Sequence, residues 1–233
     1  MRWRDVAQCG PGARALMPET PPLLVALRGL LPPDVAAGWA DPQGAHPLLP
    51  GEDLPGATPA RLREFAAGRA AVRAALAALG LPAMSIAHGK DRAPVWPVGV
   101  TGSITHTGTQ CLAVVARDTV LRGIGVDLEP AVPLDRDLWD TILLPDEQRA
   151  LMRLPPDQRG LAAKTAFSAK EAAYKAQYAR SKTLFGFEVM HLTQTDDQFT
   201  ARFRDPVPPF AAGDWIDGRI AVTAGHILTL AHF

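Results

Sequence analysis

Apolar residues recur at helical spacing in two long stretches of the chain. The first begins at Thr58, where threonine followed by proline is typical of a helix start, and it ends at Gly80. The second, "GLAAKTAFSAKEAAYKAQYAR" at residues 160–180, is rich in alanine and predicts a long helix that packs closely. A further helix is predicted to start at Pro145, where proline, aspartate and glutamate stand together.

Shorter apolar runs predict strands around these helices. The expected strands cover Leu23–Leu27, Met84–Ala87, Leu112–Ala116 and residues 123–129, 185–192, 199–203 and 219–233, the last one broken near Gly225. Residues 1–57 are otherwise rich in proline and glycine and predict a loop-rich lead-in, and "TGSITHTG" at residues 101–108 is interpreted as a turn. Because strands and helices do not alternate regularly, the order indicates an α+β fold.

The composition is that of an ordinary globular protein. The chain has 233 residues, of which 47% are hydrophobic, and its 24 basic side chains balance 24 acidic ones. This balance gives no support for a nucleic-acid-binding or membrane-surface protein. Arg28 interrupts the first apolar run, and no stretch is long enough for a membrane span, so a cytoplasmic protein is expected. Cys9 and Cys111 fit neither a metal pair nor a disulfide framework and are interpreted as a free thiol and a core residue.

The run "GIGVDLEP" places two acids at the end of a predicted strand. Side chains alternate along a strand, so Asp127 and Glu129 point to one side while Val126 and Leu128 point to the other. Pro130 has no N–H group and is expected to end the ladder. Taken alone, the two carboxylates are either a solvated strand end or part of a ligand site.

Polar residues form one stripe on the alanine-rich helix: Lys164, Ser168, Glu171 and Lys175. Alone, this stripe is interpreted as a solvent-facing surface. If Glu171 packs beside Asp127 and Glu129, however, three clustered carboxylates repel one another and need a cation. Ligands that are all carboxylate oxygens suit Mg²⁺ or Mn²⁺ and not zinc, and Mg²⁺ commonly shares its coordination shell with phosphates.

Two further segments are candidates for anion binding. The helix at residues 58–80 carries four arginines against one acid, which fits either a solvated surface or an anion site: Arg61, Arg63, Arg69 and Arg73. In "TGSITHTG", Ser103, His106 and exposed backbone N–H groups are candidates to hold an anion. His106 with Cys111 would suggest a thiol nucleophile, but no orienting acid is evident in the sequence.

Three stretches together resemble the signature motifs of a known enzyme family. "GSITHT", "GIGVDLEP" and "FSAKEAAYKA", in this order, resemble the motifs of the 4′-phosphopantetheinyl transferases. "REFAAGRAAVRAAL" and "APVWPVG" further resemble the branch typified by the enterobactin synthetase D component, whose members serve siderophore, nonribosomal-peptide or polyketide pathways. The resemblance covers residues from about 60 to 188.

The resemblance implies two similar α+β halves in a pseudo-twofold arrangement, with coenzyme A and Mg²⁺ (or Mn²⁺) between them. Residues 58–122 would form the half that binds the coenzyme nucleotide, and residues 123–233 the metal-binding and catalytic half. The reaction would move the phosphopantetheine arm of coenzyme A to a serine of an apo acyl or peptidyl carrier protein and release adenosine 3′,5′-bisphosphate. A monomer that binds no nucleic acid is expected.

The matched motifs also imply roles for individual residues. The implied metal ligands are Asp127, Glu129 and Glu171. Coenzyme phosphates would be contacted by Ser103, His106, Lys170 and Lys175, and the nucleotide end by Arg61, Arg69 and Lys90 or Arg92. Glu171 is the expected general base, acting directly or through a water, and Lys175 would stabilise the transition state.

Two other functions remain open from the sequence. A Mg²⁺-dependent phosphodiesterase or pyrophosphatase would use the same acids to hydrolyse coenzyme A without a carrier protein. A non-catalytic coenzyme A-binding protein would need the arginines but not all three acids.

Overall fold

The computed structural model describes residues 20–233, which form five helices and eight strands. The helices are α1 (Pro22–Leu30), α2 (Pro59–Ala78), α3 (Trp139–Ile142), α4 (Pro145–Leu151) and α5 (Pro156–Ser181). The strands are β1 (Val35–Ala40), β2 (Val100–His106), β3 (Cys111–Arg117), β4 (Ile124–Pro130), β5 (Met190–Gln194), β6 (Gln198–Phe203), β7 (Trp215–Thr223) and β8 (His226–His232). The α+β prediction is confirmed. No helix within these residues is apolar over the length that a bilayer crossing needs.

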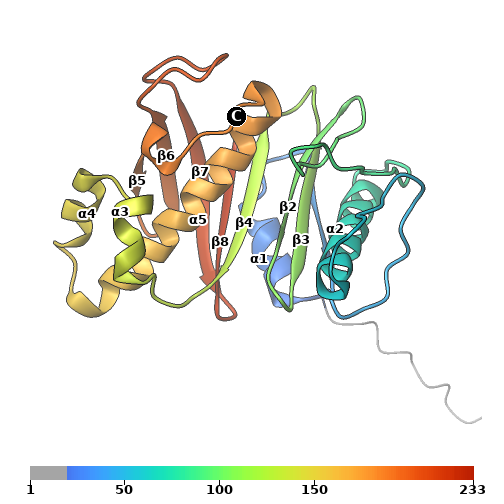
Figure 1. Cartoon of the computed structure of the whole chain (residues 1–233), viewed down its shortest axis with the longest axis horizontal. Coiled ribbons are helices and arrows are strands. Elements are labelled where there is room, and N and C mark those ends of the chain that lie inside the picture. Colours follow the sequence, from blue (N-terminus) through green and yellow to red (C-terminus); the bar gives the residue numbers. More distant parts are fainter. Residues whose placement is uncertain (1–19) are drawn as a thin grey trace, which may run out of the picture.

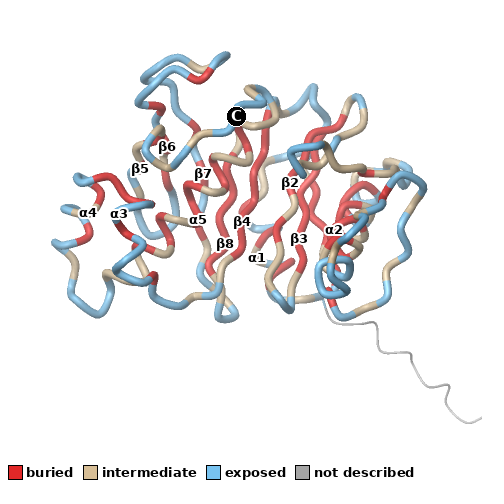
Figure 2. Tube along the Cα trace, in the orientation of Figure 1, coloured by how far each residue is buried: buried red, intermediate tan, exposed pale blue. Residues whose placement is uncertain are grey.

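The strands form two antiparallel sheets. One has the order β1-β3-β2 and the other the order β4-β8-β7-β6-β5. Figure 1 shows α2 against the smaller sheet and α5 across the larger one, with β2 and β4 as the facing edges. Burial is concentrated in the middle of the strands and on the helix faces that cover them (Figure 2).

Helix α1 packs where the two sheets meet. Leu23, Leu24, Leu27 and Leu30 of this helix are buried. They belong to one apolar cluster with residues of β1 and β3 from the smaller sheet and of β4 and β8 from the larger sheet. Val126 and Leu128 of β4 are in this cluster, whereas Asp127 points to the opposite side, toward α5. The predicted alternation along this strand is confirmed.

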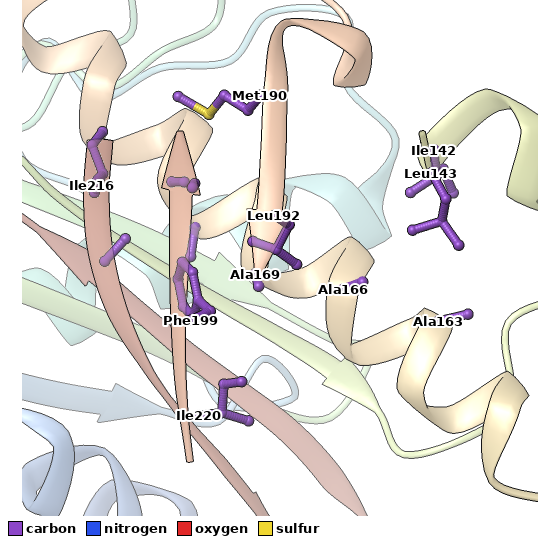
Figure 3. Packing of buried hydrophobic residues seen from close by; sticks show 14 of the residues in the cluster. Ile142, Leu143, Ala163, Ala166, Ala169, Met190, Leu192, Phe199, Ile216 and Ile220 are labelled. Atoms are coloured by element: carbon purple, nitrogen blue, oxygen red, sulfur yellow. The ribbon is translucent and has the colours of Figure 1, made fainter. Parts of the chain in front are cut away.

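The largest core lies between α5 and the five-stranded sheet. Alanines of α5 face this core and let the sheet approach closely, as Figure 3 shows for Ala163, Ala166 and Ala169. Side chains of β5 to β7, such as Phe199 and Ile220, fill the space beneath the helix. Alanine-rich packing explains why α5 has no strong apolar stripe, because its buried face consists of small residues.

A glycine in an edge strand permits the close helix approach in each half. A Cβ atom at Gly38 of β1 would collide with the backbone of Ala71 in α2. A Cβ atom at Gly125 of β4 would likewise collide with the Ala172 carbonyl oxygen, and it would lie 2.6 Å from the Ala176 nitrogen in α5. The two halves therefore use the same packing device. Their pseudo-twofold relation and the domain boundaries stay predictions.

Side-chain hydroxyls join the facing edges of the two sheets. The amide of Val126 donates to Ser103 Oγ at 3.1 Å, and the amide of Leu128 donates to Thr105 Oγ1 at 3.1 Å. Ser103 and Thr105 are two residues apart on β2, so their hydroxyls point to the same side of the strand. These bonds satisfy buried amides of β4 that have no strand partner on that side. We call this contact the hydroxyl seam.

Four predictions for secondary structure are wrong. Leu23–Leu27 belongs to a helix and not a strand, because Pro22 at its first turn favours a helix start and the leucines then share one helical face. Met84–Ala87 is extended but lies in no strand, and residues 101–106 form β2 where a turn was expected. Phe187–Val189 is a 3₁₀ turn, so the predicted strand at 185–192 begins only at Met190.

The lead-in prediction is also wrong for residues 20–57, which contain α1 and β1. Residues 1–19 of the predicted lead-in, which include Cys9, lie outside the described residues. The predicted helices at 58–80, 145 and 160–180 are confirmed, as is the break in the last strand at Gly225. Thr58 caps α2 by accepting a hydrogen bond from the Arg61 amide at 3.3 Å.

We expect Gly125→Ala to lower the free energy of unfolding by about 1–3 kcal/mol or more, because the new methyl group collides with backbone that cannot move freely. Chemical denaturation measures this effect. Gly29→Ala is the control, because a Cβ atom at exposed Gly29 meets nothing within 4 Å and alanine favours a helix. Equal stability of Gly125→Ala and wild type would contradict the packing described.

Candidate active site at the sheet junction

Asp127 is the buried centre of a polar cluster between β4 and α5. Its Oδ1 atom accepts a hydrogen bond from Lys175 Nζ at 2.6 Å, and its Oδ2 atom accepts one from Ser168 Oγ at 2.8 Å. Thr105 Oγ1 lies 3.4 Å from Oδ1. Lys175 also donates to the Val126 carbonyl at 3.2 Å, so this lysine fixes both the acid and its strand.

Glu129 and Glu171 complete the predicted acidic group. Glu129 is partly exposed and forms an ion pair with Lys164 of α5. Burial raises the pKa of Glu171, the charges of Asp127 and Glu129 raise it further, and Lys175 opposes them. Asp127, Glu129 and Glu171 therefore share one electrostatic environment, as the sequence predicted.

The cluster is short of positive charge. Lys175 is paired with Asp127 and Lys164 with Glu129, while no lysine or arginine within residues 20–233 forms an ion pair with Glu171. Three carboxylates thus face two ammonium groups. Burial is the largest cause of the raised pKa of Glu171, and the charges of Asp127 and Glu129 add to it.

The donor set fits a hard divalent cation, but the acids do not form a ready-made cage. Within residues 20–233, no three histidine, cysteine, aspartate or glutamate side chains stand close enough together to hold a metal ion. The available ligands are carboxylate oxygens, which Mg²⁺ and Mn²⁺ prefer, and the cluster carries surplus negative charge. A cation bound by all three acids would have to replace the lysine contacts of Asp127 and Glu129.

His106 and Arg61 lie beside this cluster at the end of β2. Arg61 donates to His106 Nε2 at 2.8 Å and also pairs with Glu64 at 3.1 Å. Burial lowers the pKa of His106, and the charges of Arg61 and Lys175 lower it further, while Glu64 and Asp127 act in the opposite direction. A neutral ring that accepts from Arg61 agrees with this direction.

Four residues predicted to contact the coenzyme are bonded to other groups of the protein or are exposed at its surface. Ser103 belongs to the hydroxyl seam, and Lys90 is exposed without an ion pair among the described residues. Buried Arg69 donates from Nε to the Ile86 carbonyl at 3.0 Å, and burial lowers its pKa to about 10. Lys170 is buried and pairs with Glu147 at 2.8 Å, although it also lines the pocket that contains Glu171.

Two pockets border α5 next to the cluster, one lined by Glu171 and the other by Lys175. The first has a volume of about 210 Å³ and is mostly aromatic and apolar: its lining consists of Lys170, Glu171, Tyr174, Phe185, Gly186, Phe187 and Met190. The second has a volume of about 300 Å³ and three basic side chains in its lining: Arg92, Lys175 and Lys182. Tyr174 lines both pockets, so they adjoin along the same helix.

The thiol alternative is not supported. Cys111 is buried in the core of the smaller sheet, as predicted, and burial raises the pKa of its thiol to about 12. A thiol with so high a pKa is a poor nucleophile at neutral pH.

Comparison with known proteins identifies the family of this chain. Residues 50–116 match the family described as the 4′-phosphopantetheinyl transferase N-terminal domain, and residues 123–230 match the 4′-phosphopantetheinyl transferase superfamily. The 4′-phosphopantetheinyl transferase PptT of Mycobacterium tuberculosis is 35% identical over 203 residues, which cover 82% of this chain and 88% of the relative. The chain belongs to the 4′-phosphopantetheinyl transferase superfamily. This family uses coenzyme A as co-substrate, acts on carrier proteins and is generally metal-dependent.

Two other relatives show the breadth of this superfamily. The 4′-phosphopantetheinyl transferase Svp of Streptomyces mobaraensis is 37% identical over 180 residues, covering 74% of this chain and 72% of the relative. Enterobactin synthase component D of Escherichia coli is 43% identical over 118 residues, covering 50% and 54%. The resemblance inferred from the three motifs is confirmed.

Sequence reasoning missed several residues of this candidate site. Thr105 was not recognised because its segment was interpreted as a turn, although Thr101, Ser103 and Thr105 alternate as they would on a strand. Thr229 of β8, whose hydroxyl lies 2.9 Å from Ser168 Oγ, carries no local signal because its partners are distant in sequence. Tyr174 was interpreted only as part of a helix.

We expect Lys170→Met to act on stability, because it leaves Glu147 buried without its cation. A loss of about 3–5 kcal/mol is typical for removing one partner of a buried pair. Adding Glu147→Gln should recover part of this loss, since glutamine is neutral and can still accept the Leu192 amide that Glu147 holds at 2.6 Å. Denaturant titration measures both variants. A Lys170→Met protein as stable as wild type would return Lys170 to the candidates for coenzyme binding.

Proposed function

We propose that this transferase moves the 4′-phosphopantetheine arm of coenzyme A to a serine of an apo acyl or peptidyl carrier protein, with Asp127, Glu129 and Glu171 as its metal-binding acids. The charge deficit of this acidic cluster carries the proposal. The cluster lies at the junction of the sheets, with Glu171 in the lining of an apolar pocket and Lys175 in the lining of a pocket that carries three basic side chains. These two pockets suit coenzyme A, whose diphosphate carries a largely uncharged arm on one side and a nucleotide on the other.

Coenzyme A would lie along α5 across both pockets. The aromatic pocket next to Glu171 suits the pantetheine arm, which is narrow and largely uncharged. The basic pocket offers Arg92, Lys175 and Lys182 to the diphosphate and the nucleotide. Arg61 and His106, at the other side of the cluster, are retained as phosphate contacts. Arg69 and Lys170 have buried partners that supply a structural role instead.

Mg²⁺ is the proposed metal, with Mn²⁺ as a substitute, because the acids supply only oxygen ligands. When bound, such an ion offsets the negative charge of the diphosphate. Lys164 and Lys175 would turn from the carboxylates toward phosphate oxygens as the ion takes their place. Lys175 is suited to this exchange, since its side chain remains 28% exposed.

Transfer needs a base and charge stabilisation. The serine oxygen of the carrier would form a bond to the phosphorus that bears the pantetheine arm, while the bond from that phosphorus to the bridging oxygen breaks. Adenosine 3′,5′-bisphosphate leaves with the electron pair. Glu171 takes the serine proton, directly or through a water, and its partial burial raises its pKa, which makes the carboxylate a stronger base. Lys175 stabilises the charge on the leaving group.

The pathway is proposed from the relatives. Enterobactin synthase component D is named for synthesis of a siderophore, which favours a siderophore, nonribosomal-peptide or polyketide carrier as the partner. The monomeric state and the cytoplasmic location expected from the sequence stay predictions.

Intact mass spectrometry of an apo carrier protein tests the transfer. After incubation with this protein, coenzyme A and Mg²⁺, the carrier is expected to gain one phosphopantetheine, and a carrier with alanine in place of its serine is expected to gain nothing. EDTA should abolish the gain. Consumption of coenzyme A without modification of any carrier would favour the hydrolase, and binding without consumption would favour a non-catalytic protein.

Glu171→Gln should lower the rate of this transfer by about 10²-fold or more, because glutamine neither takes the proton nor supplies charge to the metal. The matched control is Glu188→Gln, which makes the same chemical change at an exposed glutamate. Circular dichroism verifies that both variants are folded. Wild-type turnover by Glu171→Gln would remove this residue from the mechanism.

A further inference from the structure

Ser168 and Thr229 form a fully buried hydroxyl pair behind Asp127. Both residues are completely excluded from solvent, and Asp127 is 5% exposed. Ser168 lies on α5, and Thr229 is the direct cross-strand neighbour of Asp127 on β8. Their hydroxyl oxygens are 2.9 Å apart, and Thr229 Oγ1 lies 2.9 Å from the Ser168 carbonyl oxygen.

The direction of these hydrogen bonds follows from counting protons. Each hydroxyl has one proton, and an ionised carboxylate only accepts. Ser168 therefore gives its proton to Asp127 Oδ2, at 2.8 Å, because a charged acceptor forms the stronger bond. Thr229 donates its proton to the Ser168 carbonyl oxygen, and its own oxygen lies 2.9 Å from Ser168 Oγ. The result is a chain of contacts from Thr229 through Ser168 to Asp127.

The two carboxylate oxygens of Asp127 therefore have different partners. Oδ2 is held by Ser168 in the dry interior, while Oδ1 contacts Lys175, whose side chain is partly exposed. The terminal torsion of aspartate is broad and does not fix the carboxylate plane by itself. A hydrogen bond to one oxygen does fix it, and partners of this kind often decide how well an acid binds a metal.

We infer that Ser168, supported by Thr229, is a positioning residue that orients Asp127 for metal binding. The inference rests on the proposed function, because it assumes that Asp127 is a metal ligand. Ser168 belongs to the polar stripe predicted on the alanine-rich helix, but its proposed role differs from those of Glu171 and Lys175. Ser168 touches neither the coenzyme nor the carrier in this arrangement, since it is completely buried.

Binding of Mn²⁺ tests this inference without relying on turnover. Free Mn²⁺ is measured by electron paramagnetic resonance while Mn²⁺ is titrated into the full-length protein with saturating coenzyme A. Ser168→Ala should weaken Mn²⁺ binding about 10-fold or more, which is typical for loss of a hydrogen-bonded partner of a metal ligand. Ser168→Cys, with a weak donor, should lie between this variant and wild type.

Thr165→Val is the matched control. Thr165 is a buried hydroxyl residue three positions earlier on α5, and its hydroxyl donates only to the Leu161 carbonyl of the same helix, at 3.0 Å. Removal of this hydroxyl should change the melting temperature but not the affinity for Mn²⁺. Thr229→Val should weaken binding less than Ser168→Ala, because Ser168 keeps its bond to Asp127, and it serves as a second test if Ser168→Ala does not fold.

The possible results distinguish the positioning role of Ser168 from the proposed metal site. Wild-type affinity in Ser168→Ala, or equal losses in Ser168→Ala and Thr165→Val, would overturn the positioning role while leaving the metal site in place. A wild-type protein that binds no Mn²⁺ would overturn the proposed metal site and the positioning role with it. Selective loss in Ser168→Ala and Thr229→Val supports both.

Discussion

The hydrogen bonds from the amides of Val126 and Leu128 to the hydroxyls of Ser103 and Thr105 join the two sheets of this protein. A continuous main-chain ladder would have merged the sheets into one, whereas apolar side chains would have left buried amides unsatisfied at a cost of about 1–3 kcal/mol each. The hydroxyl seam avoids both outcomes. It places β4 at the junction, with its apolar side on the α1 cluster and Asp127 facing α5.

From this placement follows the chemistry of the site. Asp127 and Glu129 face α5 because side chains alternate along β4. Lys164 and Lys175 of α5 form ion pairs with these two acids. Two ammonium groups do not balance three acids, and the charges of Asp127 and Glu129 add to the effect of burial in raising the pKa of Glu171. Such a cluster is costly for the folded protein in the absence of a cation. The proposed divalent cation would offset this surplus negative charge and, once bound, would favour the anionic transition state of phosphoryl transfer.

Local signals in the sequence grouped the three acids, whereas several elements around them were predicted wrongly. Alternation along "GIGVDLEP" and helical spacing in "FSAKEAAYKA" are local signals, so Asp127, Glu129 and Glu171 were found together. Lys170 and Arg69 could not be separated from surface charges, because the acid that pairs with Lys170 and the carbonyl that accepts from Arg69 lie far away in the sequence. Helix α1 was missed because its few apolar residues fit a strand equally well, and only packing on both sheets explains its leucines.

The most direct test of this account is a crystal of the protein grown with coenzyme A and Mn²⁺, measured for anomalous scattering from manganese. We predict one strong peak at the sheet junction, within ligand distance of Asp127, Glu129 and Glu171, with Lys164 released from Glu129. A peak held by other residues, or no peak beside Asp127 when coenzyme A is bound, would contradict the claim that these three acids form one metal site.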